Sequence, residues 1–281
     1  MPTLLIFLAV ILLSGLMGIF LALWWLVPRL ERLYIFRPSR EISSTPAEVG
    51  IAFDQHFIET PDNCRLSAWH LCPNNPVGGV VYFHGNSGNL GILVEVLEML
   101  YRCDLQVLAV DYRGYGWSTG TPSETGLYRD ALATVHYFQE NLKNHQIPTI
   151  YWGRSLGSCV AAFASSQIPP DALILESAFR SKAALVQYYP QFRFFHPFST
   201  CRLDTVHHLD KHIFPVLLLH GDQDRTIPLE EGRLLFEKLT EPKESFWIEG
   251  ANHVNIHRVD GIAYMKRVLR FVKQTIPLNE Q

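Results

Sequence analysis

The stretch GRSLG at residues 153–157 places Ser155 between two glycines, and this spacing decides the fold that we expect. A strand-like run at 149–152 precedes it, and a run of small apolar residues typical of a helix follows at 159–164. A tight turn from strand to helix strains the serine backbone, and bulky side chains two residues away on either side would clash. The stretch therefore predicts a serine whose Oγ stands exposed at the edge of a sheet, beside a helix N-terminus.

A serine hydroxyl becomes an effective nucleophile only when a base takes its proton and a carboxylate orients that base. The apolar run at 215–221 is typical of a buried strand that ends at a turn. Two carboxylates, Asp222 and Asp224, follow this turn. The residues alone leave both of them open as the orienting acid.

A histidine suited to the role of base follows the last predicted strand. Residues 246–248 indicate a short strand, and the glycine-started loop after it carries His253. We predict His253 as the base, because a loop at this end of the sheet can reach the serine. His257 lies four residues later, and we expect it to be a surface histidine near the final helix.

Negative charge that develops on a substrate oxygen needs two backbone N–H groups directed at it. One would come from Leu156, the residue after the serine, and the other from the loop at 84–89, which follows a strand at 80–83. Within that loop Asn86 would supply the second N–H, since the glycines let the backbone approach a substrate closely. A phosphate-binding loop is the alternative, but the two common glycine-rich nucleotide-binding patterns are not found there.

The order of several motifs along the chain carries a family resemblance. They are HGN at 84–86, DYRGYG at 111–116 with Ser118, TPS at 121–123, GRSLG at 153–157, HGDQD at 220–224 and His253. This combination resembles the membrane-anchored, α/β-hydrolase-domain-containing branch of the α/β-hydrolase superfamily, over roughly residues 50 to 275. The resemblance implies an α/β-hydrolase fold and a serine hydrolase, without implying a substrate.

The same resemblance selects one of the two carboxylates. In this superfamily the acid ends the H-G-x-x-D motif, ahead of a hydrophobic residue and a proline, which matches Asp224. Asp222 would then cap the turn or bind backbone amides. The family often has an acidic residue two places after the histidine, where this chain has Asn255, and this departure affects only the local loop.

The first part of the chain predicts a membrane anchor. Residues 4–27 carry no charged side chain and are long enough to cross a bilayer as a helix. A cleavable signal peptide is the alternative, but it would need a basic start, a shorter apolar core and a small-residue cleavage site. We therefore expect a single-pass anchor at 4–27, a linker at 28–50 and one hydrolase domain at 51–275.

Basic residues indicate the orientation of that anchor. Arg29, Arg32, Arg37 and Arg40 follow the apolar segment, and no Lys or Arg precedes it. The positive-inside rule then places the hydrolase domain on the cytoplasmic side. The odd number of cysteines, five, agrees with a reducing compartment.

The remaining chain alternates between patterns typical of strands and helices. Strands are expected near 53–59, 66–71, 79–83, 107–110, 149–152, 172–176, 215–220 and 244–248. Helices are expected near 89–101, 124–143, 156–167, 230–239 and 260–274. After an opening hairpin this order predicts a mostly parallel sheet with helices on both faces and a site at the carboxyl ends of its strands.

An aromatic-rich insert at about 178–212 interrupts the alternation. It lies where these hydrolases carry a segment over the active site, so it is a candidate for an apolar lid that selects acyl chains or contacts the bilayer. We expect most of its aromatic side chains instead to pack the insert against the domain, while some that face the pocket would favour hydrophobic substrates.

Taken together, these features predict a membrane-anchored serine hydrolase that cleaves carboxylic esters or thioesters. The expected partners are the membrane and an ester or acyl substrate, with lipids and acylated proteins as candidates. A serine peptidase of the same fold, or a catalytically silent binding protein, are the alternatives. We expect no metal and no organic cofactor, and the net charge of −3 argues against general nucleic-acid binding.

Overall fold

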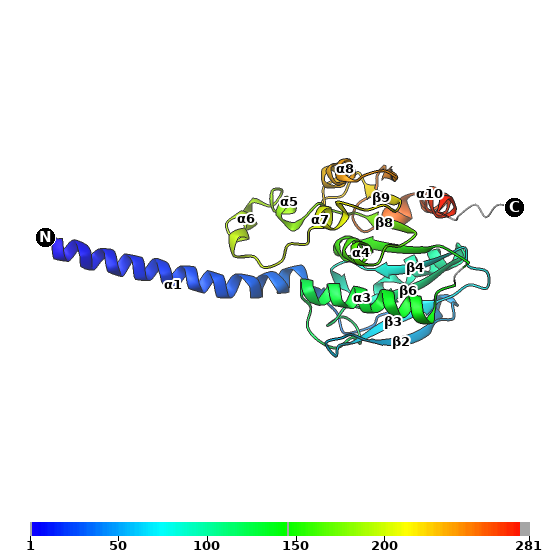
Figure 1. Cartoon of the computed structure of the whole chain (residues 1–281), viewed down its shortest axis with the longest axis horizontal. Coiled ribbons are helices and arrows are strands. Elements are labelled where there is room, and N and C mark those ends of the chain that lie inside the picture. The colour runs from blue at the N-terminus through cyan, green and yellow to red at the C-terminus, as the bar shows by residue number, and fades with distance from the viewer. Residues whose placement is uncertain (1, 145, 276–281) are drawn as a thin grey trace.

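An eight-stranded sheet organises the computed structural model, which describes residues 2–144 and 146–275 (Figure 1). Its strand order is β10-β9-β8-β7-β4-β6-β3-β2. The strands are β2 (Asp54–Glu59), β3 (Arg65–Leu71), β4 (Gly78–Phe83), β6 (Leu105–Val110), β7 (Thr149–Arg154), β8 (Ala172–Glu176), β9 (Val216–Gly221) and β10 (Lys243–Ile248). Only β2 with β3 and β3 with β6 pair antiparallel among these strands, so the predicted hairpin and mainly parallel sheet are confirmed.

Helices cover both faces of the sheet, as predicted. The longer ones in the domain are α2 (Val94–Arg102), α3 (Glu124–Asn141), α4 (Leu156–Gln167), α8 (Leu229–Lys238) and α10 (Gly261–Gln274). Alternate side chains of β4 enter two separate cores. Val81 and Phe83 pack with α3, α4 and α8, whereas Val80 and Tyr82 pack with α2 and α10. This period of two is what a strand buried on both faces produces.

The predicted insert consists of short helices between β8 and β9. They are α5 (Lys182–Val186), α6 (Pro190–Arg193), η3 (His196–Phe198) and α7 (Thr205–Leu209). Prolines at the first or second helical position start two of these helices, α6 and η3, because the fixed φ of proline suits a first helical turn. Other short elements are β1 (Arg37–Pro38), η1 (Pro46–Val49), β5 (Ser87–Gly88), η2 (Leu90–Leu93) and α9 (Ile256–Val259).

The first helix, α1 (Pro2–Ile35), extends away from the domain (Figure 1). Its segment Thr3–Ile35 is long and apolar enough to cross a membrane by length and composition. The helix continues eight residues beyond position 27, and β1 then pairs in parallel with β5. Part of the segment expected as a linker at 28–50 thus has regular structure, in the last residues of α1 and in β1. Its backbone is bonded to a loop that is distant in sequence, which no local pattern reveals.

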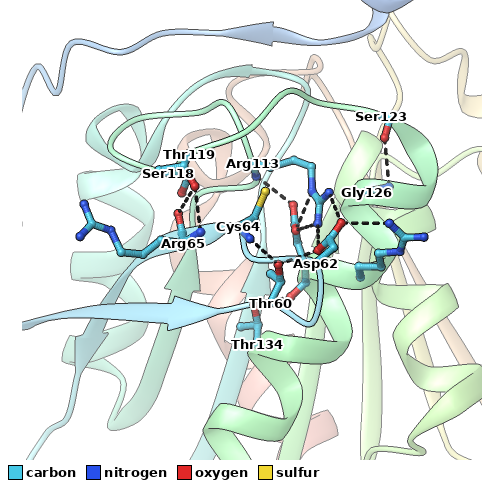
Figure 2. Close-up of polar contacts among 12 residues, drawn as sticks. Thr60, Asp62, Cys64, Arg65, Arg113, Ser118, Thr119, Ser123, Gly126 and Thr134 are labelled. Carbon is cyan, nitrogen blue, oxygen red and sulfur yellow. Dashed lines mark hydrogen bonds and ion pairs between the residues drawn. The ribbon is translucent and has the colours of Figure 1, made fainter.

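An ion-pair network fixes the hairpin to α3 (Figure 2). Arg113 donates to Asp62 at 2.8 Å and to the fully buried Asp130 at 2.7 Å. Arg129 reaches the same Asp62 from the surface, at 2.9 Å. The hydrogen bond from Arg113 holds the pKa of Asp62 well below its usual range. Arg113 thus connects the turn between β2 and β3 to the helix that covers it.

Replacing the buried arginine should destabilise the protein far more than replacing the exposed one. Arg113→Met leaves the buried Asp130 carboxylate without its cationic partner and with only the backbone N–H of residue 113 as a donor, and breaking such a pair costs about 3–5 kcal/mol of unfolding free energy. Arg129→Ala removes only an exposed pair, worth about 0–1 kcal/mol. Denaturant unfolding of both variants and wild type in one detergent measures the difference. Equal losses would contradict this account of the network.

Candidate active site

Ser155 lies at the turn between β7 and α4 with φ 54° and ψ −117°, a strained conformation for a residue other than glycine. The flanking glycines follow from close backbone packing. A Cβ atom on Gly157 would lie 2.0 Å from the Phe83 carbonyl oxygen, and one on Gly153 would lie 2.2 Å from the Gly157 oxygen. The turn thus tolerates no side chain at either position, which is the steric reason for the GRSLG spacing.

The structure brings Ser155, His253 and Asp224 into one hydrogen-bonded line, although they lie far apart in the sequence. His253 Nε2 is 3.1 Å from Ser155 Oγ, and His253 Nδ1 is 2.7 Å from Asp224 Oδ2. A carboxylate can only accept, so Nδ1 carries the proton. The Nε2 lone pair then faces the serine hydroxyl, which is the arrangement a general base requires.

Asp224 is held as a carboxylate by donors on both of its oxygens. Its Oδ1 accepts hydrogen bonds from the Thr226 and Ile227 amides, each at 2.8 Å. Burial alone would raise the pKa of Asp224, but the hydrogen bond and charge of His253 and the Ile227 N–H lower it overall. Asp222 instead accepts the Gly250 N–H at 2.8 Å, so it bonds a backbone amide, while Asp224 is the carboxylate that bonds His253.

The loop after β4 lies beside the serine. A Cβ on Gly85 would be 3.7 Å from Ser155 Cβ, which places the adjoining Asn86 close to the nucleophile. Leu156 is the first residue of α4, where backbone N–H groups have no partner within the helix. Among the described residues, neither the backbone N–H of Asn86 nor that of Leu156 donates a hydrogen bond. Both are therefore available to a substrate oxygen.

The DYRGYG motif at 111–116 supports this loop from behind. Tyr112 donates to the His84 carbonyl at 2.8 Å, and Tyr115 donates to the Asn86 carbonyl at 2.7 Å. Asp111 accepts the Leu90 N–H at 3.0 Å. Sequence reasoning used this motif only as a family signature and did not assign it a place at the site. The two tyrosines of the motif could have indicated this role, because a buried tyrosine hydroxyl needs a hydrogen-bond partner.

Known proteins resemble this chain in sequence and in fold. Residues 74–200 match the family described as Hydrolase_4, serine aminopeptidase, S33. An uncharacterised protein of Mycobacterium tuberculosis is 31% identical over 258 residues, which cover 89% of this chain and 90% of that protein. An esterase structure from Pyrococcus furiosus superposes with a TM-score of 0.70 at 23% identity, covering 86% of this chain and 98% of that one.

A further relative carries an enzyme name. The lysophosphatidylserine lipase ABHD12 of Rattus norvegicus is 31% identical over 232 residues, covering 68% of this chain. These residues span 57% of the length of that lipase. The chain belongs to the α/β-hydrolase superfamily. It is a serine hydrolase, as the motifs predicted.

In this α/β-hydrolase an arginine next to the nucleophile contacts the histidine loop. Arg154 donates to the His253 carbonyl at 2.7 Å and pairs with the buried Glu176 at 3.1 Å. Tyr264 of α10 donates to the other oxygen of Glu176 at 2.8 Å. The sequence did not predict this contact, because the motif allows any residue at the position of Arg154. It connects the serine turn directly to the backbone of the base.

His257 is buried in this hydrolase, so the expectation of a surface position was wrong. Its Nε2 lies 3.6 Å from Glu95 of α2, and it lines a surface hollow between α2 and α10. The short helix α9, which begins at Ile256, packs this histidine against the domain. A lone histidine in a polar stretch gives no sequence signal of such packing.

One group of side chains has the composition of a metal site. Asp54, His56 and His70 on the hairpin bring their ligand atoms within 4.8 Å of one another. The Gln106 side-chain nitrogen, which donates to the Leu142 carbonyl, also lies 2.9 Å from His70 Nε2. His70 Nε2 is then an acceptor, and the proton on Nδ1 faces Asp54 at 3.8 Å. A metal at Nδ1 would have to displace this proton.

Proposed function

We propose that this protein is a membrane-anchored hydrolase of carboxylic esters or thioesters that uses Ser155 as its nucleophile. The observation that carries the proposal is the line of two hydrogen bonds from Ser155 through His253 to Asp224, at 3.1 and 2.7 Å. The backbone N–H groups of Asn86 and Leu156, which donate no hydrogen bond among the described residues, support it, because acyl transfer needs donors for a developing oxyanion.

The chemistry follows from these positions. His253 Nε2 takes the proton of Ser155 Oγ, and the oxygen attacks the acyl carbon. Asp224 holds the histidine in the required tautomer and stabilises its charged form. The Asn86 and Leu156 amides bind the oxyanion, and His253 then protonates the leaving alcohol or thiol. Water, activated by the same histidine, releases the acid from the acyl-enzyme.

Acyl substrates are favoured over peptides. Relatives with the printed names lysophosphatidylserine lipase and esterase support ester cleavage, whereas the name of the matching family, serine aminopeptidase, supports a peptidase as the second candidate. The position of the insert supports the former. Phe20 of the apolar α1 contacts Phe198 at 5.5 Å between ring centroids, so the insert lies against the anchor. Phe194 of the insert is 67% exposed, which suits an apolar substrate or lipid.

Hydrolysis of p-nitrophenyl esters from acetyl to palmitoyl tests the proposal. The full chain in detergent should turn over these esters, with rates that rise with acyl length because the insert offers aromatic contacts. Ser155→Ala, which keeps the fold and removes the nucleophile, should abolish the turnover. Cleavage of aminoacyl amides with no serine-dependent cleavage of esters would instead support the peptidase.

Replacement of each of the two neighbouring aspartates by asparagine distinguishes their roles. Asp224→Asn should lower kcat by about 10⁴-fold, because the amide favours the wrong histidine tautomer. Asp222→Asn is the matched control and should have little effect, since its oxygen can still accept the Gly250 N–H. Steady-state kinetics of both variants on one ester measures this. A comparable loss in the two variants would contradict the assignment of Asp224.

The hydrolase domain is proposed to face the cytoplasm. Arg29, Arg32 and Arg37 follow the apolar segment, and the Arg29 guanidinium lies 3.8 Å above the Trp25 ring, as expected at a membrane interface.

A reporter that is active only in the cytoplasm, fused to the C-terminus of the full chain, should therefore be active. A reporter that is active only outside should be silent. The reverse pattern would refute this orientation.

A further inference from the structure

The end of the membrane helix is bonded to the loop that carries Asn86. The Asn86 side-chain amide donates to the Ile35 carbonyl at 2.9 Å, and the Arg37 N–H donates to the Asn86 carbonyl at 2.8 Å. Two residues further along, the Ser39 N–H donates to Gly88 at 2.9 Å. These bonds form the two-stranded parallel pair of β1 with β5, which is separate from the main sheet.

These contacts occupy the main-chain carbonyl of Asn86 and one hydrogen of its side-chain amide. The carbonyl accepts from the Arg37 N–H and from the Tyr115 hydroxyl, and the side-chain amide donates to Ile35. The backbone N–H has no acceptor among the described residues and is directed by these neighbouring bonds. The loop is glycine-rich and has little conformational preference of its own, so external bonds must set the direction of this N–H. Of these four bonds, one is made by Ile35 at the end of α1 and two by Arg37 and Ser39 just after it.

The segment is itself fixed to the domain. The Ser39 carbonyl accepts from the Gly116 N–H at 2.8 Å and from the Asn89 side chain at 3.1 Å. Arg40 donates to the carbonyls of Gly116 and Ser118. The strand β1 is therefore held between the Asn86 loop and the DYRGYG motif, and its position is defined by both.

We propose that the backbone of residues 35–39, at the end of the membrane helix, is a positioning element of the active site that sets the direction of the Asn86 N–H. This role rests on the proposed function, in which that N–H stabilises the oxyanion. It extends the catalytic machinery to the segment that joins anchor and domain. A change in the position of α1 relative to the domain would then alter catalysis without any contact between α1 and the substrate.

Arg37→Pro tests the role of one hydrogen bond. Proline removes the N–H that binds Asn86, and Arg37 already lies in extended backbone before Pro38, where proline is tolerated. Arg37→Ala removes the same side chain and keeps the N–H, so the ratio between the two variants isolates the amide. In the full-length protein in detergent we expect Arg37→Pro to lower kcat by about 10- to 100-fold relative to Arg37→Ala, with little change in KM.

A second readout separates positioning from general damage to the fold. A trifluoromethyl ketone forms a tetrahedral oxyanion with the serine, so its affinity should fall by the same factor as kcat. Asn86→Ala keeps the backbone N–H and removes the bond to Ile35, so it should also lower kcat and the affinity for the ketone. It provides the test if Arg37→Pro does not fold. Leu33→Ala, on an exposed position of the same helix end, should leave both unchanged.

The outcomes distinguish this role from the proposed function. Wild-type ester turnover that is lost in Ser155→Ala supports the function on its own. Unchanged kcat and ketone affinity in folded Asn86→Ala and Arg37→Pro would overturn the positioning role and leave the function intact. Equal losses in kcat and in ground-state binding would also overturn it, since a misdirected N–H acts mainly on the oxyanion.

Discussion

The close approach of α4 to the end of β4 is the constraint on which the site depends. Because Gly157 lies against the Phe83 carbonyl, the serine turn and the Asn86 loop meet directly at the carboxyl ends of neighbouring strands. One steric contact thus brings the Ser155 turn next to the loop of Asn86, the proposed oxyanion donor. It also explains why strain at Ser155 persists, since the sheet and helix on either side leave the turn no room to relax.

Much of this fold could be predicted because its signals are local. Each main strand and long helix produces its own pattern of apolar residues, and the GRSLG spacing is a steric requirement of one turn. The acid was different. Asp222 and Asp224 follow the same strand and look alike in sequence, and only a resemblance separated them. In the structure their difference is one of direction, because one carboxylate bonds the Gly250 amide and the other bonds His253.

The features that the sequence did not reveal depend on contacts between distant segments. Arg154 binds the carbonyl of His253, 99 residues away, and Asn86 binds Ile35, 51 residues away. Both bonds use backbone carbonyls, which every residue possesses, so no residue type marks the partner. For the same reason, the sequence does not show that the expected linker at 28–50 bonds to the loop after β4. Its composition is that of a loop, but its backbone is part of the folded domain.

The end of α1 contacts the domain on two sides, and this gives the anchor a structural role beyond attachment. Glu31 binds the insert through Lys182 and through Ser199 at 2.5 Å, while Ile35, one helical turn later, binds the Asn86 loop. One turn of a helix therefore fixes both the segment that lies beside the anchor and the loop that faces the serine. Because these bonds join α1 directly to the insert and to the Asn86 loop, the domain cannot rotate freely about α1. In the proposed membrane-anchored hydrolase, these contacts would hold the site in a fixed orientation relative to α1 and would define that site in part.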